Sequence, residues 1–433
     1  MKKKLPFAVI ALGLTSLFTD IATEMIYPLV PVFVSLLGAG AMALGVIEGL
    51  AESIASLLKL FSGVWTDRTG RRKRMTVIGY TISTVFRPLT GFATSVWQIV
   101  AVRAADRVGK GIRTSPRDAL LAAAAPPEIR GKAFGFHRAM DHTGAVIGPL
   151  VSLLLLTLLA GTFHVTEPMT LLRRVFQLAI IPGALAVFML LFFVKEPPDS
   201  GRSPEAFRFS LKPFDRRYTR FLAVILLFTL GNSSDAFLLY RAHEALQLNR
   251  SLLDKLAALP IFTSLSSVFN QTTLQQLIDI LFLPLFWSFF HIIKVIFSTP
   301  FGALSDRIGR RRVISTGWII YAVVYACFAF LHRLPQAVQL PAIFILFSVY
   351  ALYYALCEGA EKALIADLVQ PSLRGSAFGL YHFTVGLAAF PASLLFGTLY
   401  SLFGGSVAFL TGAALAAVSV ILLTAWVKLP ETK

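Results

Sequence analysis

The stretch Gly63–Met75, GVWTDRTGRRKRM, decides how the 433 residues of this chain are interpreted. Its Gly-x-x-x-Asp-Arg-x-Gly pattern and its run of basic residues lie between two apolar segments. The same pattern returns at Gly302–Arg312, GALSDRIGRRR. A charged turn that occurs twice, each time between hydrophobic segments, indicates that a membrane-embedded unit was duplicated.

The composition is that of a membrane protein. Hydrophobic residues make up 56% of the chain and charged residues 15%, and the mean hydropathy is +0.71. Apolar segments of about 20 residues, the length with which a helix crosses a bilayer, recur from Pro6 to Val427. Six precede Lys195 and six follow Arg220. We therefore predict an all-α polytopic membrane protein with twelve transmembrane helices in two pseudo-symmetric six-helix bundles.

The duplication also predicts the domain boundaries. We expect an N-terminal bundle at residues 1–197, a polar cytoplasmic linker at 198–216 and a C-terminal bundle at 217–433. The sequence offset between matching positions of the two halves is smaller for Glu24 and Asp235, near the start of each half, than for Asp67 and Asp306, which come later. This difference predicts an extra extracytoplasmic segment at about 246–280 and a helix that begins at about Leu281.

The formal net charge is +17, and the basic residues outside the apolar segments lie mainly on alternate loops, which belong to one face of the membrane. Cytoplasmic loops are enriched in Lys and Arg. We therefore expect both termini to be cytoplasmic and the protein to lie in the bacterial inner membrane, which it crosses several times. The placement of Lys and Arg on one face of the membrane accounts for the net positive charge, so no nucleic-acid partner is expected.

Two predicted helices carry acidic residues near the middle of the membrane. Asp20 and Glu24 are four residues apart and share one face of the first helix, and Glu48 and Glu52 repeat this arrangement on the second. An ionised side chain at that depth costs at least about 2.5 kcal/mol, so it must face a partner or a wet cavity. Together with Asp141, these acids are the candidates for proton coupling. Ion pairing with bases on neighbouring helices is the alternative.

The fourth predicted helix carries a stripe of charge. Its charged side chains fall within a sector of about 120°, so they must line a cavity or pair with acids of neighbouring helices. These side chains are Arg103, Asp106, Arg107, Lys110, Arg113 and Arg117. The candidate substrate cavity combines part of this stripe with other membrane-depth charges: Asp20, Glu24, Arg87, Arg103, Arg107, Lys110, Asp235 and Glu358.

The two halves also match at the ends of two helices. Arg117-Asp118 corresponds to Glu361-Lys362 with the signs exchanged, which predicts salt bridges of a cytoplasmic gate. On the fifth helix, small residues allow close approach of a neighbour; these are Gly135, Gly144 and Gly148, followed by Pro149. His137 and His142 lie about 140° apart around that helix, so they do not form a chelating pair. No metal site is expected.

Two six-helix bundles, a cytoplasmic linker and the duplicated charged turn resemble the major facilitator superfamily over essentially the whole chain. The resemblance implies that Asp67 pairs with basic residues and with the start of the eleventh helix, which latches the cytoplasmic side. The latch residues it implies are Gly63, Asp67, Arg68, Gly70 and Arg71, with Asp306 and Arg307 in the second copy.

The same resemblance extends to the fourth and fifth helices. Arg103 lies where the family has an Arg associated with proton transfer, although Asp106 and Arg107 stand where Gln and Gly normally follow. The glycines of the fifth helix are similar to the family's antiporter signature up to Pro149. Ser152 and Leu153 replace the last two glycines of that signature.

These observations predict a monomeric secondary transporter in contact with membrane lipids, driven by the proton gradient and without cofactors. Our first hypothesis is proton-coupled export of a small organic compound through alternating access of the two bundles. Uptake or exchange of an anionic metabolite is the second hypothesis, and a lipid or lysolipid flippase or a non-transporting sensor are further alternatives. An enzyme is not expected, because the sequence has no HExxH, GxSxG or nucleotide-binding loop.

Overall fold

The computed structural model describes residues 4–38, 41–165, 167–196, 211–232, 238 and 271–427. Within these ranges every regular element is a helix. The predicted all-α class is therefore confirmed for this part of the chain. The predicted linker lies largely outside the described residues, as does the part of the predicted extra segment before residue 271.

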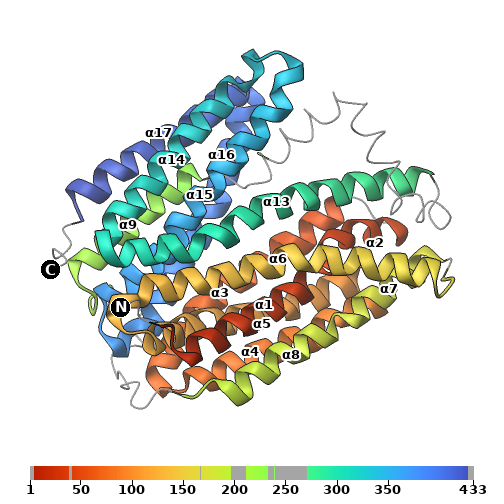
Figure 1. Ribbon diagram of the computed structural model, residues 1–433, viewed down its shortest axis with the longest axis horizontal. Helices are drawn as coiled ribbons and strands as arrows, with labels where there is room; N and C mark the ends of the chain where they lie inside the picture. The colour runs from red at the N-terminus through yellow and green to blue at the C-terminus, as the bar shows by residue number, and fades with distance from the viewer. Residues whose placement is uncertain are drawn as a thin grey trace.

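The helices of the first half form one bundle in the lower part of Figure 1. Short interruptions divide several of the predicted spans. The bundle consists of α1 (Phe7–Glu24), α2 (Val30–Leu36), α3 (Ala41–Thr69), α4 (Arg72–Phe86), α5 (Val96–Ala124), α6 (Arg130–Gly161), α7 (Pro168–Leu178) and α8 (Ile180–Phe193).

The helices of the second half form another group in the upper part of Figure 1, where α13 runs alongside α6 of the first bundle. These helices are α9 (Arg216–Gly231), α13 (Gln271–Ile308), α14 (Arg310–Phe330), α15 (Gln336–Leu368), α16 (Arg374–Phe403) and α17 (Gly405–Ala425). Both ends of the chain lie at the same end of the molecule.

Eight helical segments of the described chain are long and apolar enough to cross a membrane. This finding supports a multi-pass membrane protein, but by this criterion the described residues do not reach the predicted number of twelve. The shortfall has identifiable causes: α5 carries the charged stripe, and α9 spans only 16 residues. Both are helices, but neither has an uninterrupted apolar stretch of the required length.

Some predicted boundaries were wrong. The first apolar segment, which we expected to be one helix from about Pro6 to Leu37, is interrupted, because α1 ends at Glu24 and a 3-10 turn, Tyr27–Leu29, precedes α2. Pro28 has no N–H group with which to continue the hydrogen bonding of α1. The helix expected to begin at Leu281 begins at Gln271, so residues 271–280 are part of α13.

Both charged turns pass through a glycine with a positive φ. Gly70, between α3 and α4, has φ of 68°, and Gly309, between α13 and α14, has φ of 96°. Glycine adopts such positive φ values without a steric penalty, and it commonly ends helices in this way. The repeated glycine thus permits an abrupt turn at the equivalent place in both halves.

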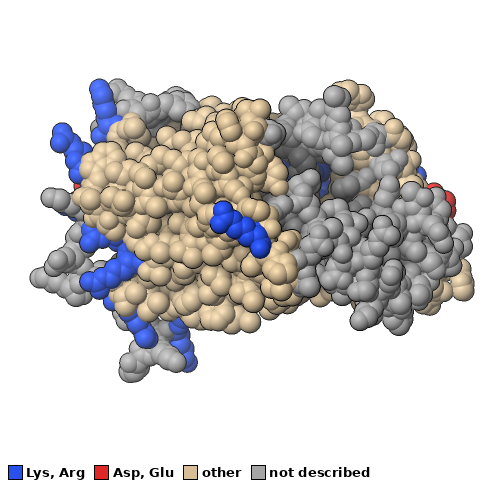
Figure 2. Space-filling view, turned by 90° about the horizontal axis from the view of Figure 1, so that it is seen from above, with Lys and Arg blue, Asp and Glu red and all other residues tan. Residues whose placement is uncertain are grey.

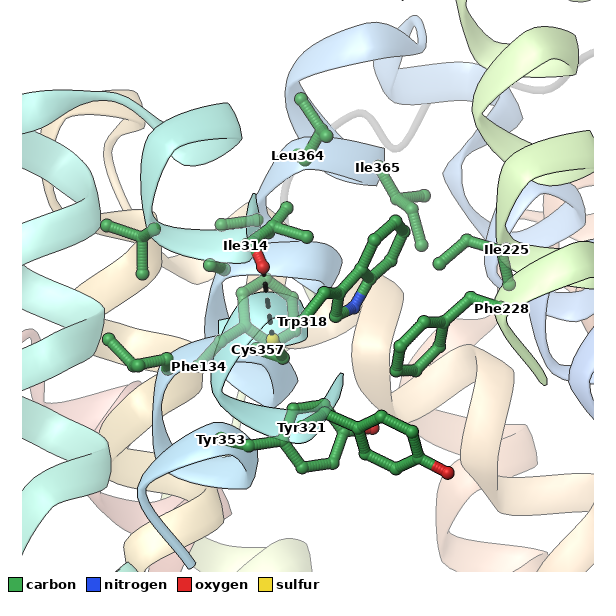
Figure 3. Packing of buried hydrophobic residues seen from close by; sticks show 14 of the residues in the cluster. Phe134, Ile225, Phe228, Ile314, Trp318, Tyr321, Tyr353, Cys357, Leu364 and Ile365 are labelled. Carbon is green, nitrogen blue, oxygen red and sulfur yellow. Dashed lines mark hydrogen bonds between the residues drawn. The ribbon is translucent and has the colours of Figure 1, made fainter. Parts of the chain in front are cut away.

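The core of the second bundle is rich in stacked aromatic rings (Figure 3). The rings of Phe228 and Trp318 are stacked with centroids 4.4 Å apart, and those of Tyr321 and Tyr325 with centroids 4.2 Å apart. Large aromatic side chains bury much apolar area and prefer such offset geometries. The second bundle is therefore packed mainly through apolar contacts, whereas most of the buried charge lies in the first bundle and between the two.

Candidate functional site

Exposed basic side chains mark the end of the molecule at which both termini lie (Figures 1 and 2). We call it the basic end; it includes residues 68–74 around the turn between α3 and α4, the buried Arg130 at the start of α6, and residues 307–312 around the turn between α13 and α14. This gathering is the pattern that the positive-inside rule associates with the cytoplasm.

Asp67 joins the two bundles at the basic end. Its Oδ1 accepts the backbone N–H of Gly375 at 2.9 Å, and its Oδ2 accepts that of Ser376 at 2.5 Å. Arg72 approaches the same carboxylate at 3.4 Å and donates to the carbonyl oxygen of Pro371 at 2.7 Å. A carboxylate is favoured at the N-terminus of α16, where N–H groups lack partners within the helix.

Asp306 makes the equivalent contact in the opposite direction. It accepts the backbone N–H groups of Gly131 and Lys132 at 2.9 and 2.8 Å, at the start of α6, and Arg310 lies 2.5 Å from its Oδ1. Each bundle thus contributes one acid that binds a helix start of the other bundle. We call these two contacts the Asp67 latch and the Asp306 latch.

The bases of the latches differ from those implied by the resemblance. Arg72 and Arg310 approach the carboxylates, whereas Arg68, Arg71 and Arg307 are exposed. Arg72 is held near Asp67 because it opens α4 directly after the Gly70 turn. The pattern of charges in the sequence did not show which of the consecutive arginines turns inward.

Glycines let the bundles meet backbone to backbone beside the latches. A Cβ atom added to Gly63 would lie 2.2 Å from the carbonyl oxygen of Gly375, and one added to Gly302 would lie 2.2 Å from that of Gly131. Cβ atoms do not approach other atoms so closely. The basic end is therefore closed by direct contact of α3 with α16 and of α6 with α13.

The next layer of the interface is centred on Asp118, which is fully buried on α5. Its carboxylate lies 2.7 Å from Lys362 Nζ and 2.9 Å from His382 Nε2, both from the second bundle, and 3.0 Å from its neighbour Arg117. The structure thus brings together Asp118 and Lys362 of the predicted gate. Glu361 instead accepts hydrogen bonds from Trp318 and Tyr381 at 3.1 and 2.7 Å. The predicted gate salt bridge is therefore seen for Asp118 and Lys362, whereas Glu361 has other partners.

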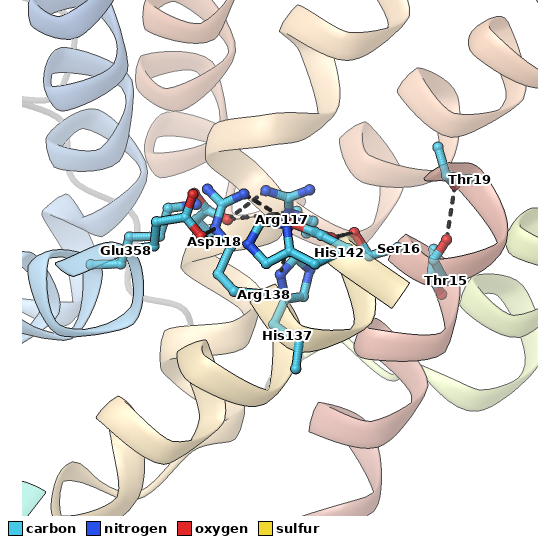
Figure 4. A network of polar contacts seen from close by, with 12 residues as sticks. Thr15, Ser16, Thr19, Arg117, Asp118, His137, Arg138, His142 and Glu358 are labelled. Atoms are coloured by element: carbon cyan, nitrogen blue, oxygen red, sulfur yellow. Dashed lines mark hydrogen bonds and ion pairs between the residues drawn. The ribbon is translucent and has the colours of Figure 1, made fainter. Parts of the chain in front are cut away.

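A third layer is centred on Glu358, and Figure 4 shows this layer together with Asp118. Glu358 lies 2.8 Å from His142 Nε2, 3.5 Å from Lys294 Nζ and 3.9 Å from Arg138 Nε. The Nδ1 atoms of His142 and His291 are 3.1 Å apart across the boundary between α6 and α13. Sequence reasoning did not select these histidines or Lys294, because their meeting depends on how the two helices are rotated.

Asp141, a candidate for proton coupling, belongs to the same layer. Its Oδ2 lies 2.9 Å from Arg138 NH1, and its Oδ1 accepts a short hydrogen bond from Ser16. Arg138 therefore connects Asp141 of the first bundle with Glu358 of the second. A carboxylate held in this way has both an ionic partner and a hydrogen-bond donor.

The predicted substrate residues meet in a cavity of about 160 Å³ within the first bundle. Its walls come from α1, α5, the turn after α1 and the 3-10 turn Arg87–Phe92. Arg103 lies nearby, with its guanidinium 5.5 Å from the ring centre of Tyr27. The cavity is lined by Asp20, Thr23, Glu24, Tyr27, Arg87, Asp106, Arg107, Lys110 and Arg113.

Not every predicted site residue joins this cavity. Glu358 and Asp141 lie in the Glu358 layer. The side chains of Glu48 and Glu52, and Asp235 as a whole, lie outside the described part of the structure. Among the residues that are described, no group of His, Cys, Asp and Glu is arranged to hold a metal ion.

The glycines of α6 explain how the acids of α1 are positioned. A Cβ atom on Gly144 would lie 2.7 Å from Cβ of Asp20, and one on Gly148 would lie 2.6 Å from Cβ of Glu24. Gly135 packs instead against the second bundle, where an added Cβ would lie 2.3 Å from the carbonyl oxygen of Ser298. In the predicted close-approach motif, Gly144 and Gly148 thus pack against the two acidic residues of α1, and Gly135 packs against the second bundle.

Comparison with known proteins agrees with this architecture. The sequence model of the Major Facilitator Superfamily matches residues 12–293 and 261–433. The chain is 33% identical over 412 residues to the uncharacterised MFS-type transporter MJ1317 of Methanocaldococcus jannaschii, covering 95% of this chain and 93% of that protein. It is 31% identical over 185 residues to the multidrug resistance protein MdtG of a Rahnella strain, covering 41% of each chain.

A solved structure has the same fold. The human organic anion transporter MFSD10 superposes with a TM-score of 0.70 and 17% identity, covering 96% of this chain and 99% of that one. The matched family consists of transporters, so the prediction that the protein is not an enzyme is confirmed. With a family match along the chain, a relative similar over nearly its full length and a shared fold, this protein belongs to the Major Facilitator Superfamily.

Proposed function

We propose that the protein is a proton-coupled secondary transporter that exports small organic compounds across the bacterial inner membrane. The observation that carries this proposal is the position of Asp20 and Glu24. Both carboxylates line one cavity inside a membrane-spanning bundle and face the bases of α5. A carboxylate in such a place can bind either a proton or a cationic partner, so a substrate and a proton can compete for it.

The two latches supply the conformational part of this proposal. They close the basic end through contacts between the two bundles. Release of both latches would let the bundles rock and expose the cavity to the other side. Both termini and the basic end would then face the cytoplasm, and one chain would suffice for transport.

Two observations favour export by antiport. Two glycines of α6, Gly144 and Gly148, belong to the motif that resembles an antiporter signature and pack against Asp20 and Glu24. The partial similarity to MdtG also points toward efflux, since that protein is named for multidrug resistance. Neither observation depends on whether the substrate is a cation or an anion.

The cavity charges favour a second candidate, the uptake or exchange of an anionic metabolite. Four basic side chains and three acidic ones line the cavity. An excess of bases would hold an anion better than a cation. Transport of organic anions only, with no movement of cationic dyes, would favour this candidate over export of cationic compounds.

The test of proton coupling is Asp20→Asn. A thermal-shift screen of cationic dyes and organic anions on the wild type would provide a transported probe, which is then measured in proteoliposomes with an imposed pH gradient. We expect Asn, which cannot carry the proton, to lower gradient-driven transport by about 100-fold, within the range that removal of a proton-transfer group produces. Probe binding should persist.

The matched control is Glu128→Gln, which removes an exposed acid at the basic end and should leave transport unchanged. Gradient-driven transport that survives in Asp20→Asn would contradict the proton assignment. Equal losses in both variants would indicate damage unrelated to the cavity.

A further inference from the structure

The charges that line the cavity divide into two groups with different surroundings. Arg87 forms an ion pair with Asp106 at 2.9 Å. Arg113 donates to the hydroxyl of Ser83 at 2.6 Å, and its guanidinium lies 4.4 Å from the ring centre of Tyr80. Arg87, Asp106 and Arg113 thus all have partners in the cavity wall.

The remaining charges are two acids on α1 and two bases on α5. Asp20 and Glu24 share one face of α1, and Arg107 and Lys110 share one face of α5. Glu24 interacts electrostatically most with Lys110 and Arg107, and also with Arg87 and Arg103. The cavity thus has two acids on its α1 wall, which face two of its bases on the α5 wall.

This balance restricts what can enter. A buried charge that loses its partner is strongly unfavourable. A cation that pairs with Glu24 would take this acid away from Lys110 and Arg107, and an anion that pairs with the bases would take them away from Glu24. A molecule that carries both charges can replace both partners at once, so that no charge is left unpaired.

We infer that this cavity binds zwitterionic organic compounds, with the ammonium group at Glu24 and the acidic group at Arg107 and Lys110. The inference rests on the proposed function in treating the cavity as the substrate site. A volume of about 160 Å³ suits a compact head group in which the two charges are separated by a few bonds or one ring. Asp20 remains available for the proton.

The test uses two matched series of probes with the full-length protein in detergent at neutral pH. The first is β-alanine with propylamine and propionate, and the second is 4-(aminomethyl)benzoate with benzylamine and benzoate. Binding is measured by titration calorimetry. In at least one series we expect the zwitterion to bind about tenfold or more tightly than either singly charged analogue, because only the zwitterion gives new partners to both Glu24 and the facing bases of α5.

Charge-removing variants make the test reciprocal. In Glu24→Gln the preferred probe should change from the zwitterion to the anion, and in Lys110→Met it should change to the cation. Glu128→Gln, at the exposed basic end, should keep the wild-type order. A change of order cannot arise from simple misfolding, which would weaken all three probes together.

The inference would be overturned if a singly charged probe bound as tightly as the zwitterion, if none of the six probes bound, or if the two variants did not reverse the order. The proposed function has its own test. A singly charged compound that binds best and is moved by the pH gradient would contradict the inference and leave the proposed function intact. A zwitterion that binds best but is not moved by any pH gradient would support the inference and contradict the proposed function.

Discussion

Asp118→Ala is expected to destabilise the closed basic end by about 3–5 kcal/mol, the range measured when one partner of a buried ion pair is removed. Asp118 is fully buried, and Lys362 Nζ and His382 Nε2 from the other bundle both lie within 2.9 Å of its carboxylate. Without this acid, Lys362 would be a buried cation that has lost its nearest carboxylate. The measurement is the fall in melting temperature of the purified protein, together with the alkylation rate of a cysteine placed at Ser298.

Ser298 is suited to this purpose because it is buried on α13, where its carbonyl oxygen lies against Gly135 of α6. A cysteine there reacts only when the two helices separate. Cys327 is exposed and is first replaced with Ser, whereas Cys357 is buried and is kept. Alkylation should be slow in the wild type and on the order of 100-fold faster or more in Asp118→Ala, as a shift of several kcal/mol requires.

The double variant Asp118→Ala/Lys362→Met is the control for this prediction. Replacing the lysine with an apolar side chain of similar length removes the uncompensated charge, so much of the lost stability should return. If the double variant were as unstable as the sum of the two single variants, the Asp118–Lys362 contact would carry no coupling energy. The central layer would then not be an ionic gate.

The second large effect is expected for Asp67→Asn combined with Asp306→Asn. Each amide keeps one acceptor oxygen but places an NH₂ group near N–H donors that the carboxylate now binds. The loss at each latch should be about 1.5–3 kcal/mol, the range for hydrogen bonds to a charged group. Since the latches are separate contacts, their effects should add, and the basic end should open.

The same Ser298 cysteine reports this opening. Asp367→Asn is the matched control, because Asp367 also pairs with arginines at the basic end, Arg130 and Arg310, but its side chain is 31% exposed. Exposed ion pairs contribute about 0–1 kcal/mol. Slow alkylation in the Asp67/Asp306 double variant, or equal acceleration in Asp367→Asn, would show that the latches do not hold the closed end.

Much of the fold was predictable because its signals are local or repeated. Segment length and apolar composition predicted a helical membrane protein, and the family resemblance carried by the repeated turn implied latches around Asp67 and Asp306. Comparison of the halves also suggested the contact between Asp118 and Lys362, which lies at 2.7 Å. These predictions required only that the two halves have the same architecture.

Other features depend on how helices are rotated against each other, which the repeat does not specify. His142 and His291 meet because α6 and α13 are side by side, although they are far apart in sequence. Arg72, rather than Arg68 or Arg71, reaches Asp67 because α4 begins at that residue. The glycines of α6 were predicted as close-contact positions, but their place behind Asp20 and Glu24 became evident only from the packing.

We propose that the two bundles move against each other and that the latches close one of two states. The most direct test is the distance between spin labels at Thr69→Cys and Gln370→Cys, one on each bundle at the basic end, with Cys327 replaced by Ser. Our account predicts a short and a long distance, whose proportions change with pH and shift to the long distance in Asp67→Asn/Asp306→Asn. A single short distance at every pH and in both proteins would contradict it.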